Sequence, residues 1–291
     1  MNENKIDLIK LIQMNFNTLS KGQKLIASYI TNHYEKAAFM TASKLGETVG
    51  VSESTVVRFA MTLGFEGYPA LQKALQQLIK SKLTTVQRLT MDEDLSNGSI
   101  LLKKILTADI DNIRMTLDEI DFDTFSKVVD AIRNAKRIYI VGLRSSSALA
   151  EYLGFYLNMI LDNVNVVTYG MSDIFEQLLK VNTEDLVIGI SYPRYSRKTL
   201  EALRYVKKQN CNIVGITDSL ISPIANLSDY TLVAKSNMAS FVDSLVAPMS
   251  VINTIIIAIG MRERAEITNY FTRLENIWQE FNVYDNTDKT D

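Results

Sequence analysis

Five short apolar runs in the second part of the chain constrain its fold more than any other feature. They begin after Lys136, and segments with helical periodicity separate them. Strands that alternate with helices form a parallel sheet covered by helices on both faces, with right-handed connections. The runs are 137–143, 165–170, 185–191, 211–218 and 230–234, and helices are expected at 145–161, 172–179, 196–209 and 222–227.

Further helices are expected on both sides of this α/β region, over 99–134, 244–263 and 268–281. Together they offer more apolar helix surface than one sheet needs to cover, at 244–260 and at Ile105, Ile110, Ile113 and Leu117. Twofold self-contacts are the commonest way to bury such surface. We therefore expect the body, residues 98–284, to form a dimer or larger assembly, followed by a disordered tail at 285–291.

The first 85 residues have no strand pattern and are expected to form an all-helical domain. Amphipathic periodicity predicts one helix at 5–16, a second starting near Ser20, and a last one around Pro69, a residue favoured in the first turn. The polar, acidic segment 86–97 is expected to be a linker. The fold class is thus multidomain, with a helical head and an α/β body that has a five-stranded parallel sheet.

Residues 41–64 of the head have the spacing of a helix-turn-helix. Leu45, Val49, Val56 and Phe59 recur at helical intervals. Gly50 can end the first helix in a left-handed conformation, and the small Gly46 lets the two helices approach closely. Ser52 is expected to cap the second helix by accepting a hydrogen bond from the Thr55 N–H.

The expected outer face of the second helix carries small polar side chains, which a helix entering the DNA major groove needs at its start. Lys44 on the first helix is expected to contact phosphate. The candidate DNA-binding residues are Thr41, Lys44, Ser52, Glu53, Ser54, Thr55 and Arg58. The alternative is an ordinary helical hairpin with a solvated face.

Charge is distributed unevenly along the chain. Residues 1–85 hold ten Lys and Arg against six Asp and Glu, a balance of +4, whereas the remainder holds 21 against 27. A basic head on an acidic body fits nucleic-acid binding by the head. The N-terminus lacks a signal-peptide apolar core, and the apolar stretch 246–261 is too short and too polar to span a bilayer, so a cytoplasmic location is expected.

A single cysteine, Cys211, and a single histidine, His33, exclude a disulfide framework and a cysteine or histidine metal site. No metal or cofactor is expected. Glu151, Asp173 and Glu176 could act as general bases, but carboxylates on helices are usually solvated or paired. No nucleophile, phosphate-loop or dinucleotide motif is found, so no catalytic residue is assigned.

Two of the predicted strands end in loops rich in serine and arginine that open helices. Ligands of parallel sheets bind at the carboxyl ends of strands, and helix N-termini attract anions. Arginine adds donors suited to phosphate oxygens. The candidate ligand residues are Gly142, Arg144, Ser145, Ser146, Ser191, Arg194, Tyr195, Ser196 and Arg197. The alternative is that the serines only cap helices and the arginines are solvated.

These stretches carry a resemblance to the RpiR-type transcriptional regulators, in which a helix-turn-helix head precedes a sugar isomerase (SIS) domain. TASKLGETVGVSESTVVRFAMTLGFEGYPALQKAL resembles the family's head. IYIVGLRSSSALAEYL and DLVIGISYPRYSRKTLEAL resemble its two phosphate loops, and GITDSLISPIANLSDYTL the segment that follows. The resemblance covers nearly the whole chain. It implies a flavodoxin-like sheet order, 2-1-3-4-5, and a dimer with the pocket near the subunit interface.

The chain departs from the family pattern in both loops. Arg144 stands where the first loop usually has a second glycine, whereas Ser146 falls at the ligand-binding serine. Ser191 and Ser196 hold the outer hydroxyl positions of the second loop, but Pro193 and Arg194 replace its inner serine and glycine. These changes imply arginine-based phosphate binding, an unusual ligand or a degenerate site.

The resulting hypothesis is a DNA-binding transcriptional regulator. Its partners would be a palindromic double-stranded operator, a phosphosugar or similar small anionic effector, and further copies of itself in a homodimer or homotetramer. No membrane partner is expected. One alternative is a phosphosugar isomerase or lyase with an accessory helical domain. The other is a dimerisation module that carries DNA-binding heads and senses nothing.

Overall fold

The computed structural model describes residues 8–82, 98–238 and 242–284. The chain divides into two compact units, Met1–Asp92 and Glu93–Asp291, which are described separately. The expected head, 1–85, falls within the first unit, and the expected body, 98–284, falls within the second. The predicted linker at 86–97 and the predicted tail at 285–291 lie outside the described residues.

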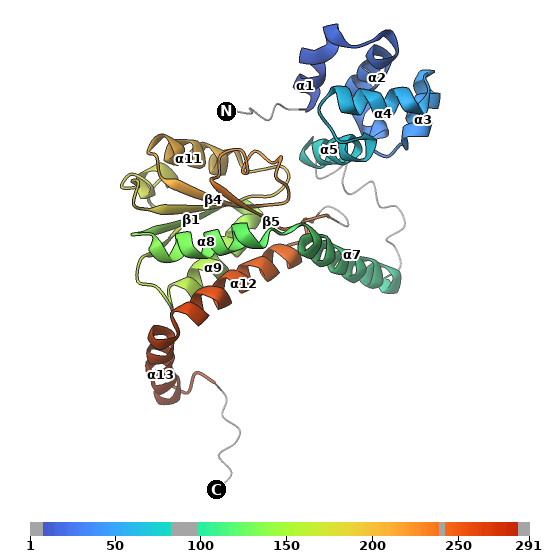
Figure 1. The fold of residues 1–291 in the computed structure, drawn as a ribbon. Helices are drawn as coiled ribbons and strands as arrows, with labels where there is room; N and C mark the ends of the chain where they lie inside the picture. The colour runs from blue at the N-terminus through green and yellow to red at the C-terminus, as the bar shows by residue number, and fades with distance from the viewer. Residues whose placement is uncertain (1–7, 83–97, 239–241, 285–291) are drawn as a thin grey trace. The chain divides into compact units, whose positions relative to one another are not determined.

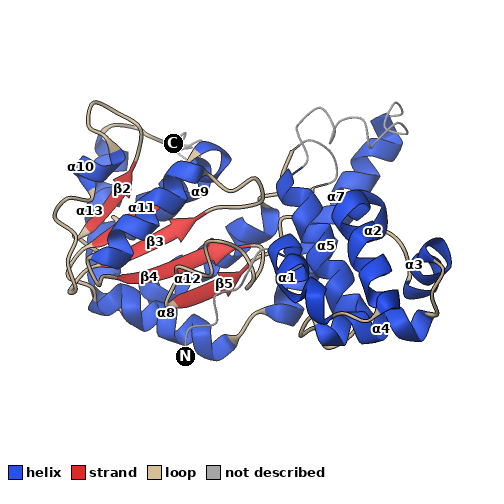
Figure 2. Cartoon of the chain, turned by 90° about the horizontal axis from the view of Figure 1, so that it is seen from above, coloured by secondary structure: helices blue, strands red, loops and turns tan. Residues whose placement is uncertain are grey.

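The head is helical throughout its described part (Figures 1 and 2). Fully buried side chains from its helices, among them Ile12, Ile26, Phe59 and Leu71, form one core. The second helix begins where predicted, because Ser20 and Gln23 form a reciprocal capping box. The elements are α1 (Leu8–Asn15), η1 (Phe16–Thr18), α2 (Lys21–Ala37), α3 (Ala42–Val49), α4 (Glu53–Thr62) and α5 (Tyr68–Lys82).

The body contains the predicted five-stranded sheet. All four strand pairings are parallel, and the order β2-β1-β3-β4-β5 confirms the predicted arrangement. The central strands are buried along their length because helices cover both faces. The strands are β1 (Ile138–Gly142), β2 (Val164–Val167), β3 (Leu186–Ile190), β4 (Asn212–Thr217) and β5 (Tyr230–Val233).

Each face of the sheet has its own apolar core. One core joins the sheet to α8 (Phe122–Asn134), α9 (Ser147–Leu157) and α12 (Val246–Arg262). The other joins it to α10 (Ile174–Gln177) and α11 (Arg197–Lys208). Figure 1 shows α11 on one side of the strands and α8, α9 and α12 on the other.

The prediction of a helix at 222–227 is wrong. This segment forms only turns, closed by short hydrogen bonds such as Ala225 N–H to Ser222 Oγ (3.1 Å). A nucleus of one turn fixes several residues for a single helical bond.

Helix α7 (Gly98–Glu119) buries polar residues against the body and exposes apolar ones. Its buried residues are Asn112 and Thr116, which hydrogen-bond to the backbone of residues 235–237 after β5. Its apolar side chains instead point outward, at Leu102, Leu106, Ile110, Ile113 and Leu117. An exposed apolar stripe of this length is typical of a surface that binds another protein.

No single helix in the described ranges is long and apolar enough to cross a membrane. Only α12 and α13 (Arg264–Glu280) reach that length and apolar character together, and they are bent by 100° relative to each other.

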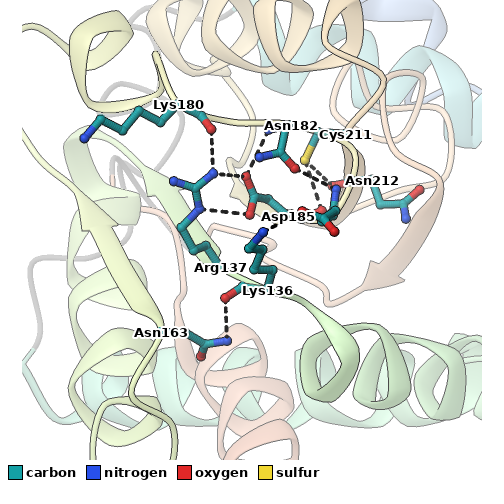
Figure 3. A network of polar contacts seen from close by, with 9 residues as sticks. Lys136, Arg137, Asn163, Lys180, Asn182, Asp185, Cys211 and Asn212 are labelled. Atoms are coloured by element: carbon teal, nitrogen blue, oxygen red, sulfur yellow. Dashed lines mark hydrogen bonds and ion pairs between the residues drawn. The ribbon is translucent and has the colours of Figure 1, made fainter.

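A polar network ties the strands together at the amino-terminal edge of the sheet (Figure 3). Arg137 donates two hydrogen bonds to the buried carboxylate of Asp185, at 3.0 and 2.8 Å, and a third to the Lys180 carbonyl at 2.6 Å. Asp185 also accepts from the Asn182 N–H, and its own carbonyl accepts from the Cys211 thiol. This edge lies opposite the carboxyl ends where ligands bind, so the network stabilises the fold.

Candidate functional site

The helix-turn-helix is formed by α3, a tight turn and α4. Gly50 adopts a left-handed conformation with φ +75°, as predicted. A Cβ on Gly46 would lie 2.7 Å from the Val51 carbonyl oxygen, which is closer than Cβ atoms come, so only glycine allows this approach of the helices. Leu45, Val56 and Phe59 are fully buried between them.

Most of the candidate DNA-binding residues lie on the exposed side of α3 and α4. Thr41, Lys44, Ser52, Glu53, Ser54 and Arg58 are exposed. Thr55, predicted exposed, is instead half-buried, and its methyl group lies toward Gly22 on α2. The structure therefore narrows the accessible face of α4 to its first residues and Arg58.

Two side-chain arrangements on this face differ from expectation. Ser52 occupies the N-cap position, but its hydroxyl does not accept from the Thr55 N–H. It bonds instead to the hydroxyls of Ser54 (3.0 Å) and Thr55 (2.9 Å). Lys44 pairs with Glu47 at 2.8 Å on the surface, an exposed pair that contributes little stability and can be exchanged for phosphate.

In the body, the first candidate ligand loop follows β1. Gly142 is required there, because a Cβ would lie 2.6 Å from the Ser146 carbonyl oxygen. Arg144 has φ +59°, and the loop continues through Ser145 into α9. Ser146 is buried at the N-cap of α9, yet its hydroxyl makes no capping bond. The capping alternative therefore does not account for Ser146.

The second loop follows β3 and is closed by its own serines. Ser191 Oγ accepts from the Ser196 N–H at 3.1 Å, and Ser196 Oγ accepts from the Thr199 N–H at 3.3 Å. Ser196 thus caps α11, whereas the Ser191 hydroxyl proton stays available to donate. Between them Arg194 is exposed, with φ +64°. Arg197, placed in the crevice by prediction, has a side chain 89% exposed and paired with Glu201 at 2.8 Å.

Tyr195 anchors the second loop to the end of the neighbouring strand. Its hydroxyl donates to Asp218 Oδ1 at 2.8 Å, and burial followed by the nearby carboxylate raises the pKa of Tyr195. Tyr192 lies in the same loop. Its hydroxyl is buried with no hydrogen-bond partner among the described residues, and burial raises its pKa well above the usual value.

Strands β4 and β5 bring further polar residues to this edge of the sheet, which the sequence reading missed. Apart from Ser146 and Ser191, the buried polar residues here are Thr217, Asp218, Ser219, Lys235 and Ser236. They follow apolar runs in the same way as the two assigned loops. Because ligands bind at the carboxyl ends of parallel strands, a search of all the predicted strand ends would have found these residues.

A chain of contacts leads from the second loop to α7. Asp218, held by Tyr195, offers its carbonyl to Lys235 Nζ at 3.2 Å. Lys235 forms an ion pair with Glu119 at the end of α7, and its N–H donates to Thr116 Oγ1 at 2.8 Å. The loop and the helix that carries the exposed apolar stripe thus belong to one network.

The three carboxylates considered as general bases either cap a helix or lie on an exposed helix surface. Asp173 accepts from the Phe175 N–H, and Glu176 accepts from the Asp173 N–H, which makes them the capping box of α10. Glu151 is exposed on α9. Across the ranges that the structure describes, no cluster of His, Cys, Asp and Glu could hold a metal ion.

Comparison with known proteins assigns both units. Residues 6–82 match the model of the helix-turn-helix domain of the rpiR family, and residues 131–258 match that of the SIS domain. The sugar isomerase domain of an RpiR transcription factor from Sphaerobacter thermophilus is 30% identical to this chain. Its crystal structure aligns over 60% of this chain and 98% of that chain, with a TM-score of 0.58.

Two further proteins match over most of their length. The structure of Vibrio vulnificus NanR complexed with ManNAc-6P is 19% identical and covers 96% of this chain and 100% of that chain, with a TM-score of 0.58. The HTH-type transcriptional regulator HexR of Pseudomonas aeruginosa is 22% identical over 279 residues, which are 92% of this chain and 94% of HexR. The two-part architecture is therefore common to the three chains.

Proposed function

Because the chain belongs to the RpiR family of helix-turn-helix transcriptional regulators, we propose that its body senses a phosphosugar or a related small anion. The effector would bind over residues 142–147 and 191–197 and change the affinity of the head for its operator. The departures from the family pattern then mark an arginine-based site rather than a degenerate one.

The backbone of Arg144 and Arg194 carries this proposal. Both are left-handed, at the ends of neighbouring strands β1 and β3. That conformation costs a residue with a Cβ about 1–2 kcal/mol. The other positive-φ residues besides glycine in the described ranges are asparagines, which tolerate it better. Arginine at both strained positions indicates that the guanidinium groups are needed there.

Other features of the same edge support an anion site. Ser146 has a buried hydroxyl that does not cap, and Tyr192 has a buried hydroxyl without a partner among the described residues. Leaving a buried hydroxyl such as that of Tyr192 unpaired costs free energy, whereas a ligand oxygen would satisfy it. The related NanR structure contains ManNAc-6P, which is a phosphosugar.

A catalytic role is disfavoured by the positions of the candidate bases. Asp173 and Glu176 serve the start of α10, and Glu151 lies on an exposed helix surface. We therefore propose a sensor without enzymatic activity, acting in the cytoplasm where operator DNA is accessible. The stripe on α7 supports a homodimer, and a twofold dimer would read a palindromic operator.

Calorimetry on the full chain tests the proposal, with a panel of phosphosugars, amino-sugar phosphates and inorganic phosphate. We expect one phosphosugar class to bind and to change operator affinity. Arg194→Ala should weaken that binding about 30-fold, the equivalent of roughly 2 kcal/mol for a lost charged contact. Arg204→Ala, which removes an exposed arginine on the helix α11 that follows the loop, is the control and should bind normally.

Three outcomes would overturn the proposal. Turnover of a panel member would favour the isomerase or lyase. An operator affinity that none of the compounds changes would favour the alternative of a dimerisation module that senses nothing. Equal binding by wild type and Arg194→Ala would move the site away from the second loop.

A further inference from the structure

Helix α13 has little contact with the chain to which it belongs. None of its 17 residues is buried, and it leaves α12 at a bend of 100°. Only its first two turns face a groove of about 350 Å³, which includes Ile267 and Phe271 from α13 and Ile160 and Gly260 from the body. Figure 1 shows its second half turned away from the sheet.

The rest of α13 carries an apolar stripe. Tyr270, Leu274, Ile277 and Phe281 follow one another at spacings of four, three and four residues, so they line one face. Tyr270 is 39% exposed, Ile277 49% and Phe281 70%. Most of the stability of a helix in a protein comes from packing of its apolar face, so we expect this face to be covered.

A line of alternating charge runs beside the stripe. Glu266, Arg273 and Glu280 are spaced seven residues apart, so they lie on one side of the helix. Suppose two copies of α13 pack antiparallel about a twofold axis at Ile277. The Arg273 of each copy then lies within one residue of the level of Glu280 of the other, and Leu274 within one residue of the level of Phe281.

An antiparallel pair places the two bodies at opposite ends of the paired helices. Self-complementarity in both shape and charge is what a twofold contact between identical chains requires.

We propose that α13 is a self-association surface whose occupant is α13 of a second copy, packed antiparallel and centred on Ile277. This surface is separate from the stripe on α7. A chain with two different twofold surfaces builds a tetramer, and a chain with one builds a dimer. Loss of the α13 contact should halve the mass of the assembly in either case.

Sedimentation of the full chain at micromolar concentration tests this. Ile277→Asp should halve the mass, whereas Thr272→Asp, an exposed change on the other side of α13, should not. Arg273→Glu and Glu280→Arg should each weaken assembly at least tenfold, and the double variant should restore it. Circular dichroism confirms that each variant is folded.

A cross-link provides an independent test of the alignment. Ile277→Cys should form an intermolecular disulfide on mild oxidation, because the twofold axis brings the two thiols together. The native Cys211 is buried and does not compete. Thr272→Cys should remain uncross-linked. If Ile277→Asp keeps the wild-type mass, or if both cysteine variants cross-link equally, α13 does not pair in this way.

Discussion

Arg144 and Arg194 hold the same left-handed backbone conformation, with φ of +59° and +64°, at the carboxyl ends of hydrogen-bonded strands β1 and β3. Each loop thereby carries an arginine at a strained backbone position. Substitution by glycine would relieve the backbone strain and remove the charge. The strain then shows as a change in stability, and the charge as a change in effector binding.

We therefore predict that Arg144→Gly and Arg194→Gly leave the free energy of unfolding unchanged or raise it by up to about 1 kcal/mol, while each weakens effector binding about 30-fold, as expected for Arg194→Ala. The relief of about 1–2 kcal/mol is partly offset by the chain entropy of glycine. Asn210→Gly, at φ +54° after α11, is the matched control and should leave binding intact. A loss of more than 1 kcal/mol in either arginine variant would contradict the strain argument.

The exposed start of α4 leads to a prediction about DNA. Ser54→Trp should abolish specific binding to genomic fragments selected by the wild-type protein, since a bulky side chain there keeps the helix out of the major groove. Lys44→Ala should weaken binding to all sequences and flatten the salt dependence by about one unit of slope. Anisotropy titrations at several salt concentrations measure both. Glu47→Ala, which frees Lys44 from its ion pair, should bind as well as wild type or better.

The exposed stripe of α7 leads to a prediction about assembly. Residues 98–291 alone should sediment as a dimer or larger, and Ile113→Glu should reduce that mass because a buried charge opposes the contact. Arg114→Glu alters the charge at the next residue, which is 72% exposed in its side chain, and should not change the mass. A monomeric body at micromolar concentration would exclude this surface.

The Arg137–Asp185 pair leads to a prediction about stability. Asp185→Ala should lower the free energy of unfolding by about 3 kcal/mol, because it leaves a partly buried guanidinium without its counterion. Lys136→Ala removes the neighbouring pair with Glu184, in which both side chains are 63% exposed, and should cost less than about 1 kcal/mol. Chemical denaturation compares the two, and equal losses would show that burial does not determine the effect.

Cys211 leads to a prediction about pH. Burial, and then the carboxylates of Asp185 and Asp229, raise the pKa of its thiol to about 12. The folded protein should therefore not react with a disulfide reagent at pH 8, and one thiol per chain should react after denaturation. The unfolded thiol ionises near pH 8.5 and the folded one does not, so this group lowers stability as pH rises above that value. Rapid reaction of the native protein would contradict the burial.

Much of this architecture could be predicted from local patterns. The strands of the body were found from runs such as Ile138–Val141, because a strand buried on both faces is apolar throughout. The turn of the helix-turn-helix was found because Gly46 and Gly50 meet steric demands that other residues do not meet. Sheet order came from the resemblance to a known family, since periodicity contains no information about which strands are neighbours.

The errors arose where tertiary contacts choose among local options. The Ser52 hydroxyl has several hydrogen-bonding groups within reach, and it bonds to the hydroxyls of Ser54 and Thr55 rather than to a backbone N–H. Arg197 had a carboxylate one turn away, at Glu201, which holds it at the surface. The bond from Tyr195 to Asp218 joins residues 23 positions apart. No local pattern predicts such a contact.

Helix α7 also sets where this protein can be divided. The SIS match begins at residue 131, but Glu119 and Thr116 complete the surroundings of the buried Lys235. A gene fusion or truncation made at the family boundary would remove both the counterion of Lys235 and the hydroxyl that accepts from its backbone N–H. The smallest transplantable unit is therefore longer than the smallest recognisable one, and a graft of the body onto another head must include α7.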